Sequence, residues 1–245
     1  YASFCRKNKA WLDDYALFMA LKDANGGKAW LEWPLEHKNA DVRQRRALMR
    51  HFKDGAGYYK FIQFIFFTQW DELKTYAHDN GIRIIGDIPI FVSPDSADIW
   101  ANKELFQLNE KGYPLAVAGV PPDYFSATGQ LWGNPLYDWD VHKATGYAWW
   151  IRRIKNQLKL VDFLRIDHFR GFEAYWSVPY GRKTAVRGKW LKGPGADLFN
   201  AICQALGNDL PIFAEDLGVI TPEVEALRDQ FHFPGMKVLQ FAFDD

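Results

Sequence analysis

Three acidic side chains follow short apolar segments that have the composition of buried parallel strands. They are Asp87, Asp167 and Glu215, each directly after a stretch that contains Ile, Leu, Val or Phe. In parallel α/β folds, ligands bind outside the carboxyl ends of the strands, so three acids there predict a shared site. A carboxylate can instead cap the helix that follows a strand, and this structural alternative stays open for each acid taken singly.

Arg165 lies two residues before Asp167, and alternate residues of a strand point to the same face. A neighbouring guanidinium favours the ionised carboxylate, which suits a nucleophile. Glu215 follows the apolar residues 212–214, where partial desolvation would favour the protonated form that a general acid requires. Retaining glycoside chemistry needs such a pair about 5 Å apart, and strands about 4.8 Å apart can supply it. The pair therefore predicts glycoside chemistry.

An aromatic cluster lies in the segment after Asp87. Aromatic residues make up 17% of the chain, and this segment holds Tyr124, Phe125, Trp132, Tyr137 and Trp139. Loops at the carboxyl end of a sheet build binding sites, and aromatic faces pack on the C–H faces of pyranose rings, so the cluster indicates a sugar substrate. The alternative is that these side chains fold the loop onto itself as a small separate core.

The composition excludes two classes of partner. The chain has 30 Lys and Arg against 30 Asp and Glu, a zero net charge that argues against nucleic-acid binding. The longest apolar runs, such as residues 64–67, are far shorter than the ~20 residues that span a bilayer, so no membrane partner is expected. No signal or transit segment is recognisable, and we expect a cytoplasmic protein.

The elements that must position these acids change in character along the chain. Residues 1–80 have the apolar periodicity of helices, with breaks at residues 25–27, 55 and 81. From residue 81 onward, short apolar strands alternate with helices, which indicates an α/β fold with a parallel sheet. The strands are expected at residues 82–87, 161–167, 210–215 and 236–241, and the helices at residues 142–159, 196–206 and 222–231. A long turn-rich loop is expected at residues 93–140.

Four strands are half of the eight that a (β/α)₈ barrel needs, although 245 residues is close to the length of a whole barrel. The residues leave two interpretations open: an open sheet of four or five strands, or part of a barrel.

Five ordered motifs closely resemble those of the 4-α-glucanotransferases, also called amylomaltases or disproportionating enzymes, which form glycoside hydrolase family 77. The motifs are GDIPIFV at residues 86–92, GVPPDYF at 119–125, GQLWGNPLY at 129–137, LRIDHFRG at 164–171 and AEDLG at 214–218. The resemblance covers essentially the whole chain.

The resemblance implies a role for each acid. Asp167 would be the nucleophile that forms a glycosyl-enzyme intermediate, Glu215 the acid/base and Arg165 the residue that orients Asp167. His168, for which a purely structural role is the alternative, would contact the donor sugar. The sugar subsites would be lined by Asp87, Asp123, Gln130, Trp132, Asn134, Asp216 and Asp245, with Tyr124 and Phe125 in the same loop.

The implied reaction cleaves an α-1,4-glucan or maltooligosaccharide donor. The glucan segment passes to the 4-hydroxyl of an acceptor glucan or glucose with the anomeric configuration retained. Members act in starch and maltodextrin metabolism and need no metal and no other cofactor.

The resemblance also implies an internal fragment of one catalytic (β/α)₈ barrel domain, holding about strands three to six. Residues 1–80 would be a mostly helical insertion and residues 81–245 the barrel strands, with a sugar-binding loop at 93–140. The family's third carboxylate, in a His-Asp pair on a later strand, and its first strand have no counterpart here. We therefore expect the chain alone to be inactive.

Two other functions remain as alternatives. A metal-dependent barrel enzyme would use Asp87, Asp167 and Glu215 to hold a divalent cation, although Arg165 would place a fixed positive charge beside it. A non-catalytic glucan-binding module would account for the 11 Trp residues without requiring turnover.

Overall fold

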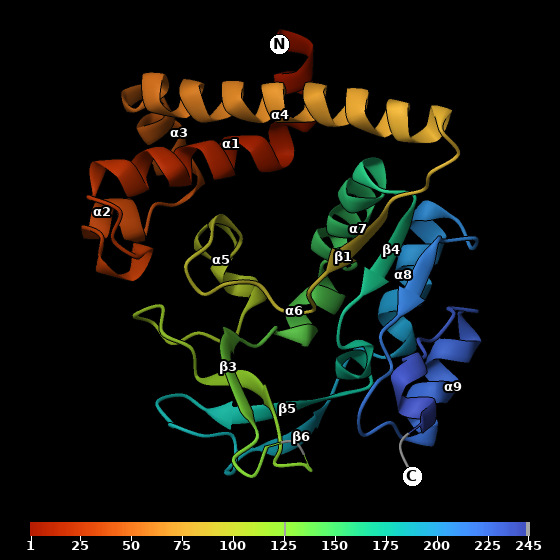
Figure 1. Cartoon of the computed structure of the whole chain (residues 1–245). Coiled ribbons are helices and arrows are strands. Elements are labelled where there is room, and N and C mark those ends of the chain that lie inside the picture. The colour runs from red at the N-terminus through yellow and green to blue at the C-terminus, as the bar shows by residue number, and fades with distance from the viewer. Residues whose placement is uncertain (125, 244–245) are drawn as a thin grey trace.

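The computed structural model describes residues 1–124 and 126–243, and it is a mixed α/β structure. Within these residues the strands form a three-stranded parallel sheet and a four-stranded antiparallel sheet. Figure 1 shows a layer of long helices at one end, the parallel strands with their helices in the middle, and the antiparallel sheet at the other end. The acids of interest belong to the middle layer.

The helical layer consists of α1 (Ala2–Ala24), α2 (Leu35–Lys38), α3 (Val42–His51) and α4 (Lys53–Asp79). Long helices α1 and α4 lie side by side (Figure 1). Asp41 caps α3 in a capping box with Gln44. The predicted break at Gly55 is wrong, because this glycine lies inside α4. A Cβ there would sit 3.2 Å from the Cβ of Ala20, so the glycine allows α1 and α4 to approach closely.

The parallel sheet contains β1 (Ile85–Ile88), β4 (Phe163–Ile166) and β7 (Ile212–Ala214), in the order β1-β4-β7. Its register pairs Asp87 with Arg165 and Ile166 with Ala214. The carboxyl ends of the three strands therefore meet at one edge of the sheet, as the sequence predicted.

The expected fourth strand at residues 236–241 is wrong. Residues 236–238 are irregular and are followed by a 3₁₀ turn, η4 (Leu239–Phe243). One backbone hydrogen bond, from Ala214 N–H to the Pro234 carbonyl (2.9 Å), still joins this segment to β7. Met236 N–H, two residues further on, donates to the Asp216 carboxylate instead of to a strand.

The helices beside the sheet largely follow prediction. Helices α8 (Ala196–Leu206) and α9 (Pro222–Gln230) are confirmed. The helix expected at residues 142–159 is two helices, α6 (Trp139–Ala144) and α7 (Ala148–Leu160). Left-handed backbone at Gly146 and Tyr147 (φ 61° and 55°) separates them.

The antiparallel sheet has the order β3-β2-β5-β6 and was not predicted. Its strands are β2 (Ala116–Val120), β3 (Gln130–Pro135), β5 (Ala174–Pro179) and β6 (Lys189–Lys192). The segment expected as a loop at residues 93–140 thus holds two strands, together with α5 (Ala97–Ala101) and the 3₁₀ turn η2 (Lys103–Leu105). A Cβ at Gly119 would lie 2.3 Å from the Gln130 carbonyl oxygen. A glycine is therefore needed at this position for β2 to pair with β3.

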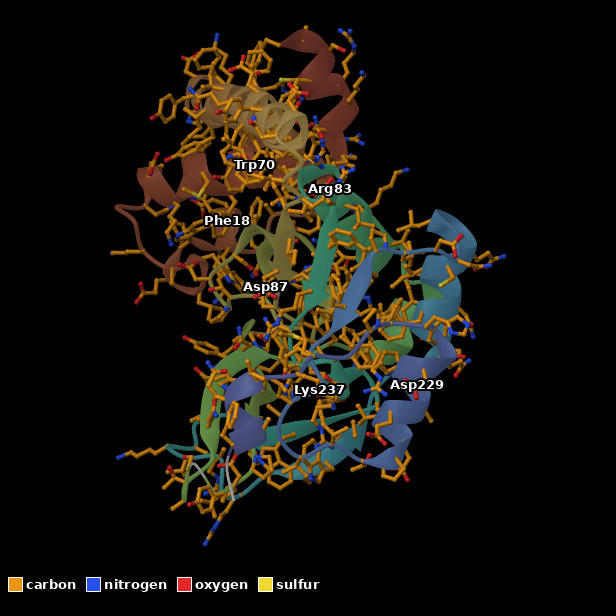
Figure 2. All side chains as sticks on the ribbon, turned by 45° about the vertical axis from the view of Figure 1, so that its right-hand side comes forward. Phe18, Trp70, Arg83, Asp87, Asp229 and Lys237 are labelled. Atoms are coloured by element: carbon orange, nitrogen blue, oxygen red, sulfur yellow. The ribbon has the colours of Figure 1, made fainter. Side chains whose placement is uncertain are left out.

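One large core joins the layers. Its largest fully buried side chains include Trp30, Trp150, Tyr137, Phe169, Phe172 and Phe199. Figure 2 shows Asp87 between the helical layer, marked by Phe18 and Trp70, and the antiparallel sheet. Among the described helices, none combines the length and the apolar character needed to cross a membrane.

Candidate active site

Arg165 joins two of the predicted acids. Its Nη1 donates to Asp87 Oδ1 and its Nη2 to Asp167 Oδ1, each at 2.8 Å. Burial lowers the pKa of Arg165, but the hydrogen bond to Asp87 and the charge of Asp167 outweigh burial and raise it. The structure confirms that Arg165 and Asp167 extend from the same side of β4. The guanidinium therefore stays charged and fixes both carboxylates.

This geometry weakens the metal alternative. The positive charge of Arg165 already lies between the Asp87 and Asp167 carboxylates, where a divalent cation would have to bind. In the described ranges, no group of three or more His, Cys, Asp or Glu side chains could hold a metal ion.

Glu215 is held by backbone donors. Its Oε2 accepts from His168 N–H (2.9 Å) and its Oε1 from Leu217 N–H (2.8 Å). Its own N–H donates to the Ile166 carbonyl (3.0 Å), one residue before Asp167. The two acids therefore lie at the same end of neighbouring strands. The sequence predicted an apolar setting for Glu215, whereas the structure gives its carboxyl group two backbone N–H partners.

His168 and Trp132 form a second part of the site. His168 has a left-handed backbone (φ 53°), and its ring meets the Trp132 ring edge to face with centroids 4.8 Å apart. Burial, and secondarily the positive charge of Arg170, lowers the pKa of His168 from 6.5 to about 4, so the ring is neutral near pH 7. Its Nε2 has no hydrogen-bond partner among the described residues. This nitrogen is thus neutral, buried and unpartnered within the described part of the chain.

The residues of β3 divide into two roles. Gln130 Oε1 accepts from Trp132 Nε1 (3.0 Å) and so orients the indole beside His168. The side-chain amide of Asn134 donates to the Val92 carbonyl (2.8 Å), which ties β3 to the segment after β1. The structure thus brings Trp132 to His168, the residue after Asp167, and gives the Asn134 amide group a structural partner.

The remaining predicted residues lie elsewhere. Asp123 accepts from Ser126 N–H (2.8 Å) in the turn between β2 and β3, and Tyr124 beside it is 97% exposed. Phe125 and Asp245 lie outside the described residues.

Asp216 requires a correction, because it was expected to line a sugar subsite. Its side chain is only 4% exposed; it is ion-paired with Arg228 and accepts from Met236 N–H (2.8 Å). A carboxylate with these partners anchors the polypeptide and offers little surface to a ligand.

The aromatic cluster is also divided. Tyr137 is fully buried and donates to the Ile90 carbonyl (2.8 Å), and the Trp139 ring stacks on that of Trp150. These two side chains pack inside the protein, as in the alternative interpretation of the aromatic cluster, and do not face a ligand site. Trp132 and Tyr124 remain outside the core, with 37% and 97% of their surface exposed.

The sequence profile of 4-α-glucanotransferases, glycoside hydrolase family 77, matches residues 1–245. The chain belongs to this family. It is 57% identical to a 4-α-glucanotransferase of Synechocystis over the whole chain and 56% identical to one of Thermus thermophilus. It spans about half of these relatives, 48% and 49% of their lengths.

Solved structures of amylomaltases have a similar fold. The structure of the amylomaltase of Streptococcus agalactiae in complex with acarbose has a TM-score of 0.93 and 45% identity, and the match covers the whole of this chain and 49% of that one. The amylomaltase of Corynebacterium glutamicum has a TM-score of 0.77 at 21% identity, a likeness of fold.

Met236 is a residue of the candidate site that the sequence did not predict. Met236 Sδ lies 3.2 Å from Arg165 Nε, on the guanidinium that bridges the acids. The two residues are 71 positions apart, and residue 236 was expected in a strand. No local sequence signal marks such a contact.

Proposed function

We propose that this chain supplies the nucleophile and the acid/base of a retaining 4-α-glucanotransferase. The observation that carries the proposal is Arg165 bridging Asp87 and Asp167 beside a Glu215 fixed by two backbone amides. This arrangement provides one carboxylate paired with a guanidinium and a second carboxyl group at the same end of the next strand, which supports double displacement at an anomeric carbon.

In the proposed first step, an Asp167 oxygen bonds to the anomeric carbon as the bond from that carbon to the leaving glucan oxygen breaks. Glu215 gives its proton to the leaving oxygen. In the second step, the acceptor's 4-hydroxyl oxygen replaces Asp167 on the anomeric carbon and passes its proton to Glu215. Two inversions retain the anomeric configuration and return both carboxyl groups to their starting states.

The substrates would be maltooligosaccharides or longer α-1,4-glucans as donor and acceptor. The solved relative bound to acarbose supports a sugar site. Trp132 offers a partly exposed aromatic face, 37% exposed, next to the neutral ring of His168. We assign these two side chains to the donor sugar, and Asp87, Gln130 and Asn134 to positioning around it. Asp123, Tyr124, Phe125 and Asp245 remain predicted subsite residues.

The parallel strands β1, β4 and β7 would be consecutive strands of a (β/α)₈ barrel, completed by sequence beyond this chain. Residues 1–80 would be a helical insertion and the segment 93–140 a sugar-binding subdomain. Relatives of about twice the length support this arrangement. A cytoplasmic role in starch and maltodextrin metabolism stays a prediction from the family resemblance.

The test uses a chimera in which this chain replaces the matching half of the Synechocystis relative, with the Thermus thermophilus relative as a second host. The measurement is glucose release from maltotriose. Asp167→Asn should lower kcat by about a thousandfold or more, because it removes the nucleophile. Asp197→Asn, on the surface of α8, is the matched control and should leave kcat unchanged. Activity of Asp167→Asn within about threefold of the unmodified chimera would refute the assignment.

Glu215→Gln separates proton donation from other roles. It should slow transfer from maltooligosaccharides while sparing donors whose leaving group needs no proton. Equal losses on both donors would contradict the acid role. Loss of activity with EDTA and recovery with Mg²⁺ would favour the metal alternative, and binding of maltotriose without turnover the binding-module alternative.

A further inference from the structure

The guanidinium of Arg165 has a third contact besides its two carboxylates. Nη1 and Nη2 donate to Asp87 and Asp167, and Nε donates to the sulfur of Met236 at 3.2 Å. A guanidinium is planar, so partners at all three nitrogens permit a single orientation of the plane. The two carboxylates come from the sheet, whereas Met236 comes from the irregular segment after α9.

The position of Met236 depends on Asp216. Asp216 Oδ1 accepts from Met236 N–H at 2.8 Å, while Oδ2 pairs with Arg228 of α9. The preceding residue is Gly235, where a Cβ would lie 2.3 Å from Asp216 Oδ2. The segment thus passes directly over the buried Asp216 carboxylate. This carboxylate holds the segment in place, because no strand pairing among the described residues does so at Met236.

The chemistry of the acceptor matters. A thioether is a weak, uncharged acceptor. It satisfies the Nε–H of a side chain that is only 26% exposed, and it adds no negative charge to compete with Asp167 for the guanidinium. A carboxylate in that place would share the positive charge among three anions.

We propose that Met236 is a positioning residue for Arg165, and that Asp216 positions Met236 in turn. The relay Asp216–Met236–Arg165 sets the plane in which the guanidinium meets Asp167. The expected effect of the relay on kcat rests on the proposed function. Its effect on the orientation of the Arg165 guanidinium does not depend on turnover.

Two substitutions in the chimera test the relay kinetically. Met236→Leu keeps the volume and removes the acceptor. It should lower kcat about fivefold with KM little changed, the size of effect expected when one ordinary hydrogen bond is lost, because the thioether is a weak acceptor. Met236→Gln places an amide oxygen at similar reach and should restore kcat to within about twofold. Met49→Leu, on α3, is the matched control and should change neither constant.

A second readout does not require activity. The Arg165 Nε–H resonance, assigned by its loss in Arg165→Lys, should exchange with solvent about tenfold faster in Met236→Leu than in the unmodified chimera or Met236→Gln. Unchanged exchange in Met236→Leu overturns the relay, as does an equal loss of kcat in the Leu and Gln variants. A chimera without transfer activity refutes the proposed function, while the exchange measurement still decides the relay.

Discussion

At the residue scale, two histidines are held neutral by the fold. His168 lies between the two acids in sequence and contacts Trp132, and His142 is fully buried among aromatic rings in the core. Burial is the largest cause in both cases and lowers each pKa from 6.5 to about 4. Because its ring is neutral near pH 7, His168 adds no positive charge beside Arg170.

These pKa values predict a loss of stability in acid. The folded pKa of about 4 is below the ordinary 6.5, so the unfolded chain binds more protons between these values and the free energy of unfolding falls as pH falls through that window. His142→Phe removes one titrating group. Its loss of unfolding free energy between pH 7 and about pH 4.5 should be about 2 kcal/mol smaller than that of the unmodified chain.

Urea unfolding at the two pH values measures this difference. Because the comparison is between pH values within each protein, a constant change in stability caused by the substitution cancels. Equal losses of unfolding free energy in the two proteins would show that the pKa of His142 in the folded chain is not lowered.

At the element scale, helix α4 contains two glycines, one turn apart or less, whose surroundings differ. Gly55 faces α1, where a Cβ would lie 3.2 Å from that of Ala20, whereas a Cβ at Gly57 would meet nothing within 4 Å. Both glycines reduce helix propensity, but only Gly55 gains close helix packing in return.

This contrast predicts different effects of the same substitution. Gly57→Ala should raise the free energy of unfolding by about 0.5–1 kcal/mol through helix propensity alone. Gly55→Ala should gain less, or lose stability, because α1 must move by a few tenths of an ångström. Thermal or urea unfolding of the two variants gives the comparison, and an equal gain in both would show that α1 moves without cost.

At the scale of the whole molecule, the described sheet exposes apolar surface at β1. Ile82 and Ile85 are 57% and 63% exposed, beside a strand whose one pairing in the sheet, among the described residues, is with β4. The chain also spans about half of the relatives it matches. In the proposed barrel, a further strand would cover this side of β1.

We therefore predict that the 245-residue chain alone releases no glucose from maltotriose, while the chimera does. The acids would be present in both, but substrate subsites built by other strands would be present in the chimera alone. The same assay measures both proteins at equal concentration. Comparable rates would mean that this chain contains every group the reaction needs.

Local sequence patterns determined the parts of the protein that depend on near neighbours. Three features follow from spacing along one element: the strand-end acids, the shared side of Arg165 and Asp167, and helices α8 and α9. Strand alternation and helix periodicity are local properties, so a single sequence displays them.

Only the tertiary structure decided the contacts between distant segments. It paired the strands of the unpredicted antiparallel sheet, buried Asp216 against Arg228, and set the ring of Trp132 against His168. It also replaced an expected strand with a segment that carries Met236 to Arg165. Such contacts depend on packing and on competition for hydrogen-bond donors across the fold, which no local spacing records.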